Sequence, residues 1–423
     1  MTEAAPAAEA LPQPEALADP LCLMRREPIL DKDKSLVAYG LTPLWTGGVA
    51  GDAGEAVLAH CRRFDVNRFL GRLPHQFQAS AAMLRQPAVH MLPHNRSLLD
   101  IPEGLEVTPE LLQNFAALSR SGLRFSLRGD LAANPAYDAL LPFCKSIHFD
   151  PARSTKAEIF RQTLAHKQAG RTLSITTPST PGELDTALIL GFSRFHGAWP
   201  RPSAATSAFT PRQKTLLRLL TLAMGDSETP EIQACIAHDS ELSGILLNMV
   251  NTPAFGLPQE VESLNQAIML LGRRQLQRWV QMLMYTEAGK PKGFLSPILI
   301  QACARACLLE QLSVLRFPEQ SVRAEAAFAV GMFSTMDQLI SGLSMQDLLA
   351  QITVDVPIRQ ALTDRTGALG PDLRLAILLF PLAGEASEDA APLLEQMALE
   401  ADQLAPLIQQ AFEWSHDMTQ AAQ

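Results

Sequence analysis

The sequence lacks a surplus of positive charge and lacks any long apolar run, and each shortage excludes a class of protein. Its 423 residues contain 35 Lys and Arg against 44 Asp and Glu, so the formal net charge is −9. A protein that follows a phosphate backbone normally carries a basic surplus, so we expect no nonspecific binding to nucleic acid. No apolar run approaches the roughly 20 residues that span a bilayer, so we expect no membrane insertion.

Cysteine is also scarce, and its spacing predicts neither disulfides nor a zinc site. Cys303 and Cys307 are one helical turn apart, but no second His or Cys pair lies nearby to complete four ligands. We therefore expect free, buried thiols in a reducing cytoplasm. The six cysteines are Cys22, Cys61, Cys144, Cys235, Cys303 and Cys307.

The two halves of the chain have different patterns. Residues 1–20 are rich in Ala, Pro and Glu and have no basic start, which predicts a disordered leader rather than a secretory signal. In residues 21–202, short apolar runs alternate with helical stretches, which favours parallel strands with crossover helices in either a closed barrel or an open sheet. Pro, Ser, Ala and Thr in 203–211 indicate a linker, crossed by few contacts unless the two domains pack tightly. Residues 212–423 are almost entirely helical in pattern.

Hydrophobic periodicity and turn residues place the individual elements. Strands are expected around 28–30, 36–41, 88–94, 123–127, 146–150, 171–177 and 192–197, with a polar turn at 31–34. Helices are expected at 109–121, 157–169, 181–191, 215–224, 242–250, 267–283, 298–311, 325–339, 358–366, 373–382 and from 390 to the end.

Three short motifs follow one another in the helical half. They are Asp239-Ser240-Glu241-Leu242, the NTPAFG run 251–256 and the AIMLLG run 267–272. They are similar to the Asp-Pro-x-Leu, Asn-Ser-x-x-Phe-Gly and Ala-Ile-x-x-Leu-Gly motifs of the HDOD domain, a helical output module of bacterial signal transduction. We interpret the signature residues as structural, with the Asp239 carboxylate capping a helix. These residues are Asp239, Asn251, Phe255, Gly256 and Gly272.

The start of the first half resembles another bacterial module. Residues 26–45 (REPILDKDKSLVAYGLTPLW) resemble the strand, turn and strand that open an EAL domain and end in its Glu-Ala-Leu-x-Arg-Trp motif. The resemblance implies membership of the EAL-HDOD family. The implied fold is α/β plus all-α, with a degenerate EAL-type (β/α) barrel over 21–202 and a helical, HD-related HDOD domain over 212–423.

An active EAL domain uses two divalent cations to hydrolyse cyclic di-GMP, and the family supplies oxygen ligands for them from its strand ends. Most of those positions hold other residue types here: Gly40 and Leu44 for the motif's Glu and Arg, Pro93 at or near an Asn, Arg128-Gly129 for an Asp pair, His148 for a Lys, and Thr176 near a Glu. Trp45 and Asp150 are the remaining matches. One carboxylate cannot hold two metals, so we expect no catalytic residues, no metal and no cofactor.

Histidines offer two further metal hypotheses. His148 and His196 lie at expected strand ends, where they are either transition-metal ligands or ordinary hydrogen-bonded histidines, and we favour the second. His238-Asp239 resembles the doublet of HD phosphohydrolases, which need more His and Asp ligands on neighbouring helices. From residue 212 onward the one other histidine is His416, so we expect no metal site there.

The sequence therefore predicts a cytoplasmic, non-catalytic signalling or scaffold protein that binds other signalling proteins. A homodimer is expected only from the general frequency of homodimers. One alternative is a receptor that binds cyclic di-GMP without hydrolysing it, although Leu44 removes an arginine that would face the phosphates. The other alternative, favoured least, is an active phosphodiesterase.

Overall fold

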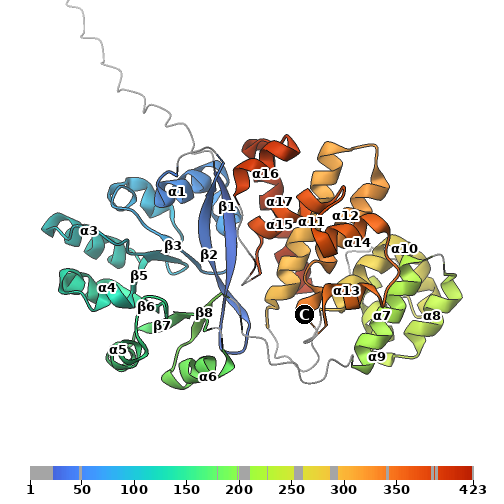
Figure 1. The fold of residues 1–423 in the computed structure, drawn as a ribbon, viewed down its shortest axis with the longest axis horizontal. Coiled ribbons are helices and arrows are strands. Elements are labelled where there is room, and N and C mark those ends of the chain that lie inside the picture. The colour runs from blue at the N-terminus through green and yellow to red at the C-terminus, as the bar shows by residue number, and fades with distance from the viewer. Residues whose placement is uncertain are drawn as a thin grey trace, which may run out of the picture.

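In the computed structural model the chain forms a barrel followed by a helical domain (Figure 1). The structure describes residues 22–46, 50–178, 180–197, 199, 210–225, 227–251, 261–285, 294–339, 343–382, 385 and 389–421. The expected leader and nearly all of the expected linker lie outside these residues, as do Phe255 and Gly256 of the HDOD signature.

Within the described residues, eight strands close into a barrel in sequence order. β1 is antiparallel to both of its neighbours, β2 and β8, whereas β2 to β8 run parallel. The barrel strands are β1 Cys22–Leu30, β2 Leu36–Trp45, β3 His75–Gln78, β4 Ser97–Asp100, β5 Arg124–Arg128, β6 Cys144–Phe149, β7 Thr172–Thr176 and β8 Arg194–His196. Its helices are α1 Ala53–Arg63, α2 Val66–Leu70, α3 Pro109–Arg120, α4 Gly129–Ala132, α5 Lys156–Gln168 and α6 Pro181–Leu190, with 3-10 helices at Met83–Arg85, Pro87–Met91 and Pro135–Phe143.

Local sequence explains where several of these elements begin. The β1–β2 turn is closed by Asp31, whose carboxylate accepts hydrogen bonds from the backbone N–H groups of Asp33 and Ser35, both at 2.9 Å. α5 starts with a capping box in which Thr155 and Glu158 satisfy each other's backbone donors. Such local signals are readable in sequence, so the turn and the helices α3, α5 and α6 agree with expectation, whereas α1, α2 and α4 were not predicted.

Two strands and one 3-10 helix differ from the sequence prediction. The expected strand at 88–94 is wrong, because the chain forms the 3-10 helix Pro87–Met91 there. The strands that were missed are β3 and β4, each only four residues long. β3 reads HQFQ, and a strand that short and that polar carries no apolar alternation.

The helical domain follows the predicted all-helical pattern, with different boundaries and with two further short helices, Thr229–Ala237 and Met345–Leu349, that were not predicted. Its helices are α7 Pro211–Met224, α8 Thr229–Ala237, α9 Ser240–Val250, α10 Leu264–Leu283, α11 Pro297–Arg316, α12 Ser321–Phe333, α13 Met345–Leu349, α14 Val356–Asp364, α15 Gly370–Leu379, α16 Ala390–Met397 and α17 Ala401–Ala421, with a 3-10 turn at Met336–Gln338. The expected single helix from residue 390 is in fact two helices, because Ala398 adopts a left-handed conformation that ends α16.

α11 is the central helix of this domain. It is the one helix of the described residues that is long and apolar enough to cross a membrane, but 72% of its apolar stretch is buried inside the protein. It packs closely against α12 and α17. The apolar character of α11 is therefore explained by its place in a protein core. All six cysteines, including Cys303 and Cys307 on α11, are buried thiols that form no disulfide, as expected.

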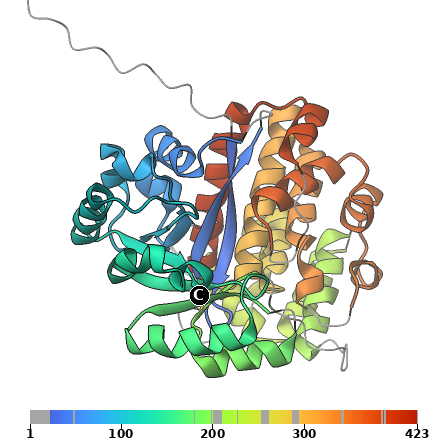
Figure 2. The same ribbon diagram turned by 60° about the vertical axis from the view of Figure 1, so that its left-hand side comes forward.

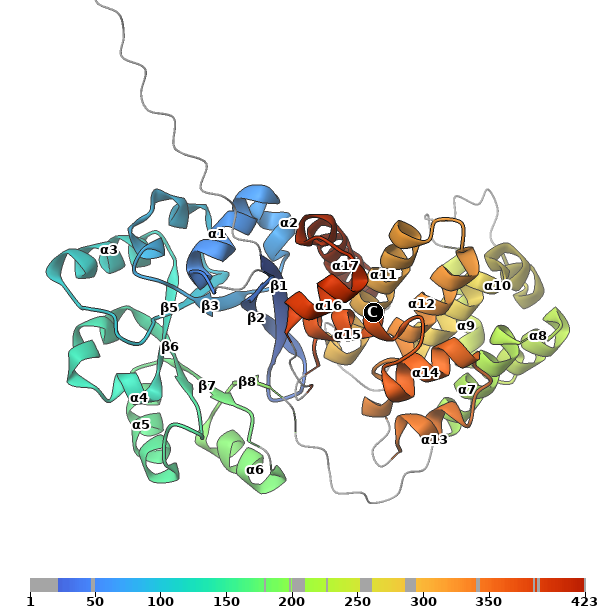
Figure 3. The same cartoon turned by 45° about the horizontal axis from the view of Figure 1, so that its top comes forward.

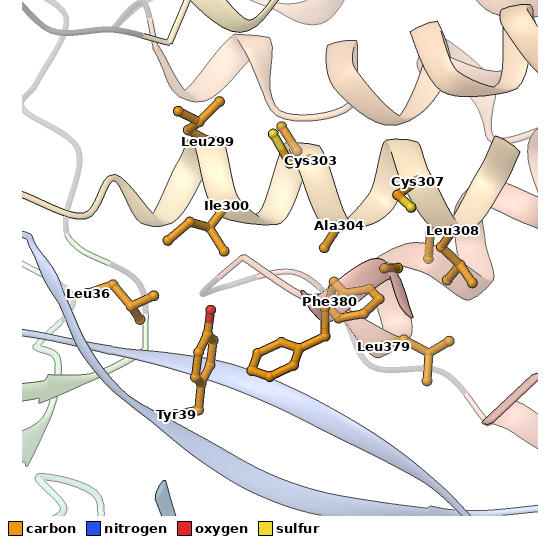
Figure 4. Packing of buried hydrophobic residues seen from close by; sticks show 14 of the residues in the cluster. Leu36, Tyr39, Leu299, Ile300, Cys303, Ala304, Cys307, Leu308, Leu379 and Phe380 are labelled. Atoms are coloured by element: carbon orange, nitrogen blue, oxygen red, sulfur yellow. The ribbon is translucent and has the colours of Figure 1, made fainter. Parts of the chain in front are cut away.

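The two domains pack tightly through the β1–β2 hairpin. Figure 2 shows this hairpin running between the rest of the barrel and the C-terminal helices. Its outer face contacts α15, α16 and α17, and Gln301 of α11 donates a hydrogen bond to the carbonyl of Arg26 on β1. In Figure 4 Leu36 and Tyr39 of β2 point toward Ile300 and its neighbours on α11. The backbone N–H of Leu36 also donates to the carbonyl of Leu295, at 2.9 Å. The barrel and the helical domain thus share one continuous apolar core.

A buried polar cluster lies within this domain interface. Arg26 of β1 is 1% exposed and donates to the carbonyl of Phe69 at 2.9 Å and to the side-chain oxygen of Gln409 at 3.2 Å. The Tyr39 hydroxyl lies 3.0 Å from Nε2 of His416 on α17. Burial lowers the pKa of Arg26 to about 10 and that of His416 to about 4, so at neutral pH the arginine is charged and the histidine neutral.

Candidate functional site

The parallel strands bring polar side chains together near one end of the barrel, where the loops that follow each strand meet. These side chains belong to Gln76, Asp100, Arg128, His148, Thr176 and His196, on β3 to β8 in that order. The predicted site residues Arg128, His148 and Thr176 are therefore brought to one place. Gln76 and Asp100 were missed, because the two four-residue strands that carry them were missed.

Two arginines and two carboxylates form an ion-pair network at the mouth of the barrel. The Arg128 guanidinium contacts Asp130 at 2.7 Å and Glu103 at 3.0 Å, and Arg153 contacts the same Glu103 carboxylate at 3.5 Å. Hydrogen bonding from Arg128 lowers the pKa of Asp130, and the same hydrogen bond raises the pKa of Arg128. Both carboxylates are thus already neutralised by side chains of the protein.

Two histidines pack against each other inside the barrel. The rings of His148 and His196 are 4.5 Å apart and nearly perpendicular. The two ring nitrogens of His148 lie 3.2 Å from the hydroxyls of Ser174 and Thr176. Burial lowers the pKa of His148 to about 4 and that of His196 well below its usual value. Both rings are therefore neutral at pH 7, and His148 is engaged by hydroxyl groups as an ordinary buried histidine would be.

Asp100 is held by a neighbouring amide. Nε2 of Gln76 donates to both carboxylate oxygens of Asp100, at 2.9 and 3.1 Å. Burial of the carboxyl group inside the barrel raises its pKa to about 7, although the hydrogen bonds from Gln76 act in the opposite direction. The native protein therefore holds a proton on this group at a pH where the unfolded chain has released it.

The carboxyl group of Asp100 should consequently contribute less stability as the pH rises from 5 to 8, whereas the buried histidines, whose pKa values are lowered in the native state, contribute more. The native pKa of Asp100 lies above its unfolded value, so this group binds more protons in the native state over this range, and its own contribution falls by about 2 kcal/mol. Asp100→Asn should remove this one contribution, so between pH 5 and pH 8 the free energy of unfolding of the variant should rise by about 2 kcal/mol relative to that of the unmodified protein, measured by urea unfolding at the two pH values. Asp185→Asn on the exposed face of α6 is the control that keeps it. An unchanged difference in Asp100→Asn would contradict the assignment.

These residues do not fit a pair of divalent cations. Gly40 has no side chain, and Asp150 accepts a hydrogen bond from the backbone N–H of Ala152 at 2.9 Å, which orders the turn after β6. The placement of Pro93 near a ligand position is wrong, because Pro93 lies outside the strands, in the segment between the second 3-10 helix and β4. Among the described residues, no three His, Cys, Asp or Glu side chains come together as a metal would need.

A cleft with a volume of about 370 Å³ opens beside this cluster. It lies between the loop that enters α1 (51–54), the end of β3 (78–81) and the loop after β4 (102–105). Glu103 joins the cleft to the ion-pair network, because its carboxylate also contacts Arg128. This cleft at the barrel mouth is large enough to admit a small molecule.

Two signature residues of the helical domain, Asp239 and Asn251, have backbone hydrogen-bond partners. The Asp239 carboxylate accepts hydrogen bonds from the N–H groups of Glu241 and Leu242 and so caps α9. Asn251 follows the last residue of α9, and its side chain donates to the carbonyl of Val261 at 2.9 Å and accepts from the Val261 N–H at 2.8 Å. Gly272 interrupts α10 with φ 71°, a conformation that favours glycine.

Asn251→Ala should lower the free energy of unfolding by about 1–3 kcal/mol, because both hydrogen bonds between the Asn251 side chain and the Val261 backbone are lost. Chemical denaturation of the full chain measures this. Asn248→Ala, at an exposed position of α9, is a control that should change little. Normal stability together with loss of a binding partner would instead assign Asn251 to a binding surface.

Both halves of the chain are similar to known proteins. The model of the HDOD domain matches residues 212–366. Cyclic di-GMP phosphodiesterase CdgJ of Vibrio cholerae is 26% identical over 292 residues, which span 67% of this chain and 66% of that protein. The uncharacterised protein YuxH of Bacillus subtilis is 26% identical over 278 residues, 63% of this chain and 66% of that protein. The matched region is thus just under two thirds of the length of each relative.

The barrel resembles solved EAL domains. One match is the EAL domain of Xanthomonas citri FimX in complex with c-diGMP. The alignment spans 45% of this chain and 90% of the FimX chain, with 14% sequence identity and a TM-score of 0.34. A second match is an EAL domain protein of Listeria monocytogenes. The alignment spans 42% of this chain and 85% of the Listeria chain, with 10% sequence identity and a TM-score of 0.34.

Proposed function

From an architecture in which an EAL-like barrel is followed by an HDOD domain, we propose that this chain is a non-catalytic protein of cyclic di-GMP signalling. Its named relative CdgJ is a cyclic di-GMP phosphodiesterase, which supports the signalling system. The carboxylate groups at the barrel mouth are already paired with other side chains, which supports the loss of hydrolysis. In this proposal the protein acts in the cytoplasm as a scaffold for other signalling proteins.

The observation that carries the proposal is the state of the carboxylates. Hydrolysis with two cations needs several carboxylate or amide oxygens free to bind metal. Here Asp130 and Glu103 are paired with Arg128, and Asp100 is held by Gln76 with a raised pKa. The positive charge of Arg128 would also repel a divalent cation at the mouth.

The test is a hydrolysis assay with purified full-length protein, excess cyclic di-GMP and Mg²⁺ or Mn²⁺. We expect no linear dinucleotide above the rate without protein, while an active EAL phosphodiesterase in parallel shows that the assay works. Metal-dependent turnover by the unmodified protein would overturn the proposal.

Gly40→Glu alone should not restore activity. A Cβ at position 40 would lie 3.8 Å from the Cβ of Glu27, so the variant has room to fold. It would add one carboxylate, whereas Arg128 and the Gln76–Asp100 pair would stay in place. Turnover in this variant alone would show that the remaining positions hold metal after all.

A receptor without hydrolysis is the second candidate, and the 370 Å³ cleft is the observation in its favour. Calorimetric titration with cyclic di-GMP, with and without Mg²⁺, separates the two. Binding without turnover supports the receptor, and no binding supports the scaffold.

The scaffold proposal is supported by an exposed apolar surface on α10. The side chains of Met269 and Leu270 are 63% and 46% exposed, and a partner protein would cover them.

A further inference from the structure

Two arginines face the interior of the barrel at the end where its parallel strands begin. Arg124 is the first residue of β5 and Arg194 is the first residue of β8. Alternate residues of a strand share a face, so Arg124 is on the face of Arg128 and Arg194 is on the face of His196. That face is the barrel interior, because Arg128 pairs in the sheet with His148, whose ring meets the ring of His196 at 4.5 Å.

These arginines lie at the opposite end of the barrel from the cleft and the ion-pair network. Strands β2 to β8 run parallel, so their first residues gather at one end and their last residues at the other. Figure 3 shows β5 to β8 on the part of the barrel that carries α3 to α6, with the helical domain beyond the β1–β2 hairpin. A ligand at this strand-start end would therefore be separate from the candidate site described above.

Neither arginine forms a salt bridge within the part of the chain that the structure describes. Arg194 is partly buried, and burial and the charge of Arg124 both lower its pKa, with no carboxylate of the described residues raising it. The Asp31 carboxylate follows the end of β1 near this site, but it accepts hydrogen bonds from backbone N–H groups of its own turn. A partly buried cation beside a second cation is unfavourable unless an anion joins them.

The chemistry of these side chains suits a phosphate group. A guanidinium group is planar and presents paired N–H donors that match phosphate oxygens. Arg194 pairs in the sheet with Ser174 of β7, and Thr172 lies two residues earlier on the same face, where its hydroxyl is a further donor.

We propose that Arg124, Thr172 and Arg194 bind the phosphate group of a ligand at the strand-start end of the barrel. The group belongs either to a soluble phosphorylated compound or to a phospholipid headgroup, and the experiments below distinguish these two sources. The inference is independent of whether the barrel mouth binds or hydrolyses cyclic di-GMP, because the two sites lie at opposite ends.

The first test is calorimetric titration of the full-length protein with pyrophosphate, at an ionic strength held constant with potassium chloride. The unmodified protein should bind pyrophosphate, although its net charge of −9 gives no general attraction for anions. Arg124→Gln and Arg194→Gln should each raise the dissociation constant by about tenfold or more, because each removes one of the two guanidinium groups. Arg85→Gln, at an exposed position of the 3-10 helix Met83–Arg85, is the control that should bind normally.

A stability measurement separates a binding role from a structural one. Without ligand, Arg194→Gln should be at least as stable as the unmodified protein, because it removes a partly buried charge that lies beside a second cation. Pyrophosphate should raise the melting temperature of the unmodified protein and leave that of Arg194→Gln unchanged.

Vesicles of phosphatidylcholine, with and without phosphatidylglycerol, identify the source of the phosphate group. Cosedimentation with the phosphatidylglycerol vesicles that is lost in Arg194→Gln assigns a lipid headgroup, whereas binding of pyrophosphate alone assigns a soluble ligand. The proposal is overturned if the unmodified protein binds neither pyrophosphate nor these vesicles. It is also overturned if Arg194→Gln binds as tightly as the unmodified protein, or if this variant loses stability in the absence of ligand.

Discussion

Arg26→Ala should lower the free energy of unfolding by about 3–5 kcal/mol, which is a large share of the stability of a typical domain. The guanidinium lies between two aromatic rings, 4.3 Å from the centre of Phe412 and 5.0 Å from that of Phe69. The truncation would open a cavity between the barrel and α17. It would also leave the carbonyl of Phe69 and the side-chain oxygen of Gln409 without this donor.

Two variants make this measurement specific. Arg68→Ala removes an exposed ion pair with Glu413 at the same interface, and because solvent screens this pair we expect a much smaller loss of stability than for Arg26→Ala. Arg26→Met keeps most of the volume and removes the cost of burying a charge, so its effect should be smaller than that of Arg26→Ala. Urea denaturation of each full-length variant gives the comparison. A change below about 1 kcal/mol in Arg26→Ala would show that the two domains do not depend on this contact.

Gly331→Ala should cost about 3 kcal/mol, and Gly331→Leu should prevent the helical domain from folding. Gly331 lies in α12 where this helix crosses α11. A Cβ at this position would come within 2.3 Å of the backbone N and Cα of Ala306, and within 2.7 Å of the carbonyl carbon of Arg305. Backbone atoms of a buried helix cannot move aside as a flexible side chain can, so the two helices would have to separate.

Gly244 is the matched control. It also lies within a helix, α9, but a Cβ there would meet nothing within 4 Å. Gly244→Ala should therefore raise the stability by about 0.5–1 kcal/mol through helix propensity alone. Thermal and chemical unfolding of the two alanine variants should give opposite signs. A stabilised Gly331→Ala would mean that α11 and α12 do not approach each other this closely.

The sequence alone was enough to place the local elements. The turn at 31–34 and the starts of α3, α5 and α6 depend on residues within four positions of one another, so their signals stand together in the sequence. The cap at Asp239 and the end of α9 before Asn251 were predicted for the same reason. The motifs around these two residues also pointed to the HDOD domain, whose model matches residues 212–366.

Most of the candidate site required the fold. Arg128, His148 and Thr176 could be singled out by resemblance, but the sequence did not show that Arg128 neutralises Glu103 and Asp130, or that His148 rests on two hydroxyl groups. Gln76 and Asp100 carried no signal of their own. Each lies on a strand of four residues, and such a strand is stabilised by its parallel neighbours rather than by its own pattern.

Sequence by itself determined that an alternating α/β half precedes a helical half, because hydrophobic period and turn chemistry are local properties of the chain. Tertiary structure decided which strands close the barrel and how the β1–β2 hairpin docks on α11, α15 and α17. Arg26 and His416 are 390 positions apart, and their placement at one buried interface depends on how two complete domains pack. No periodicity encodes that contact, because it exists only once both surfaces have formed.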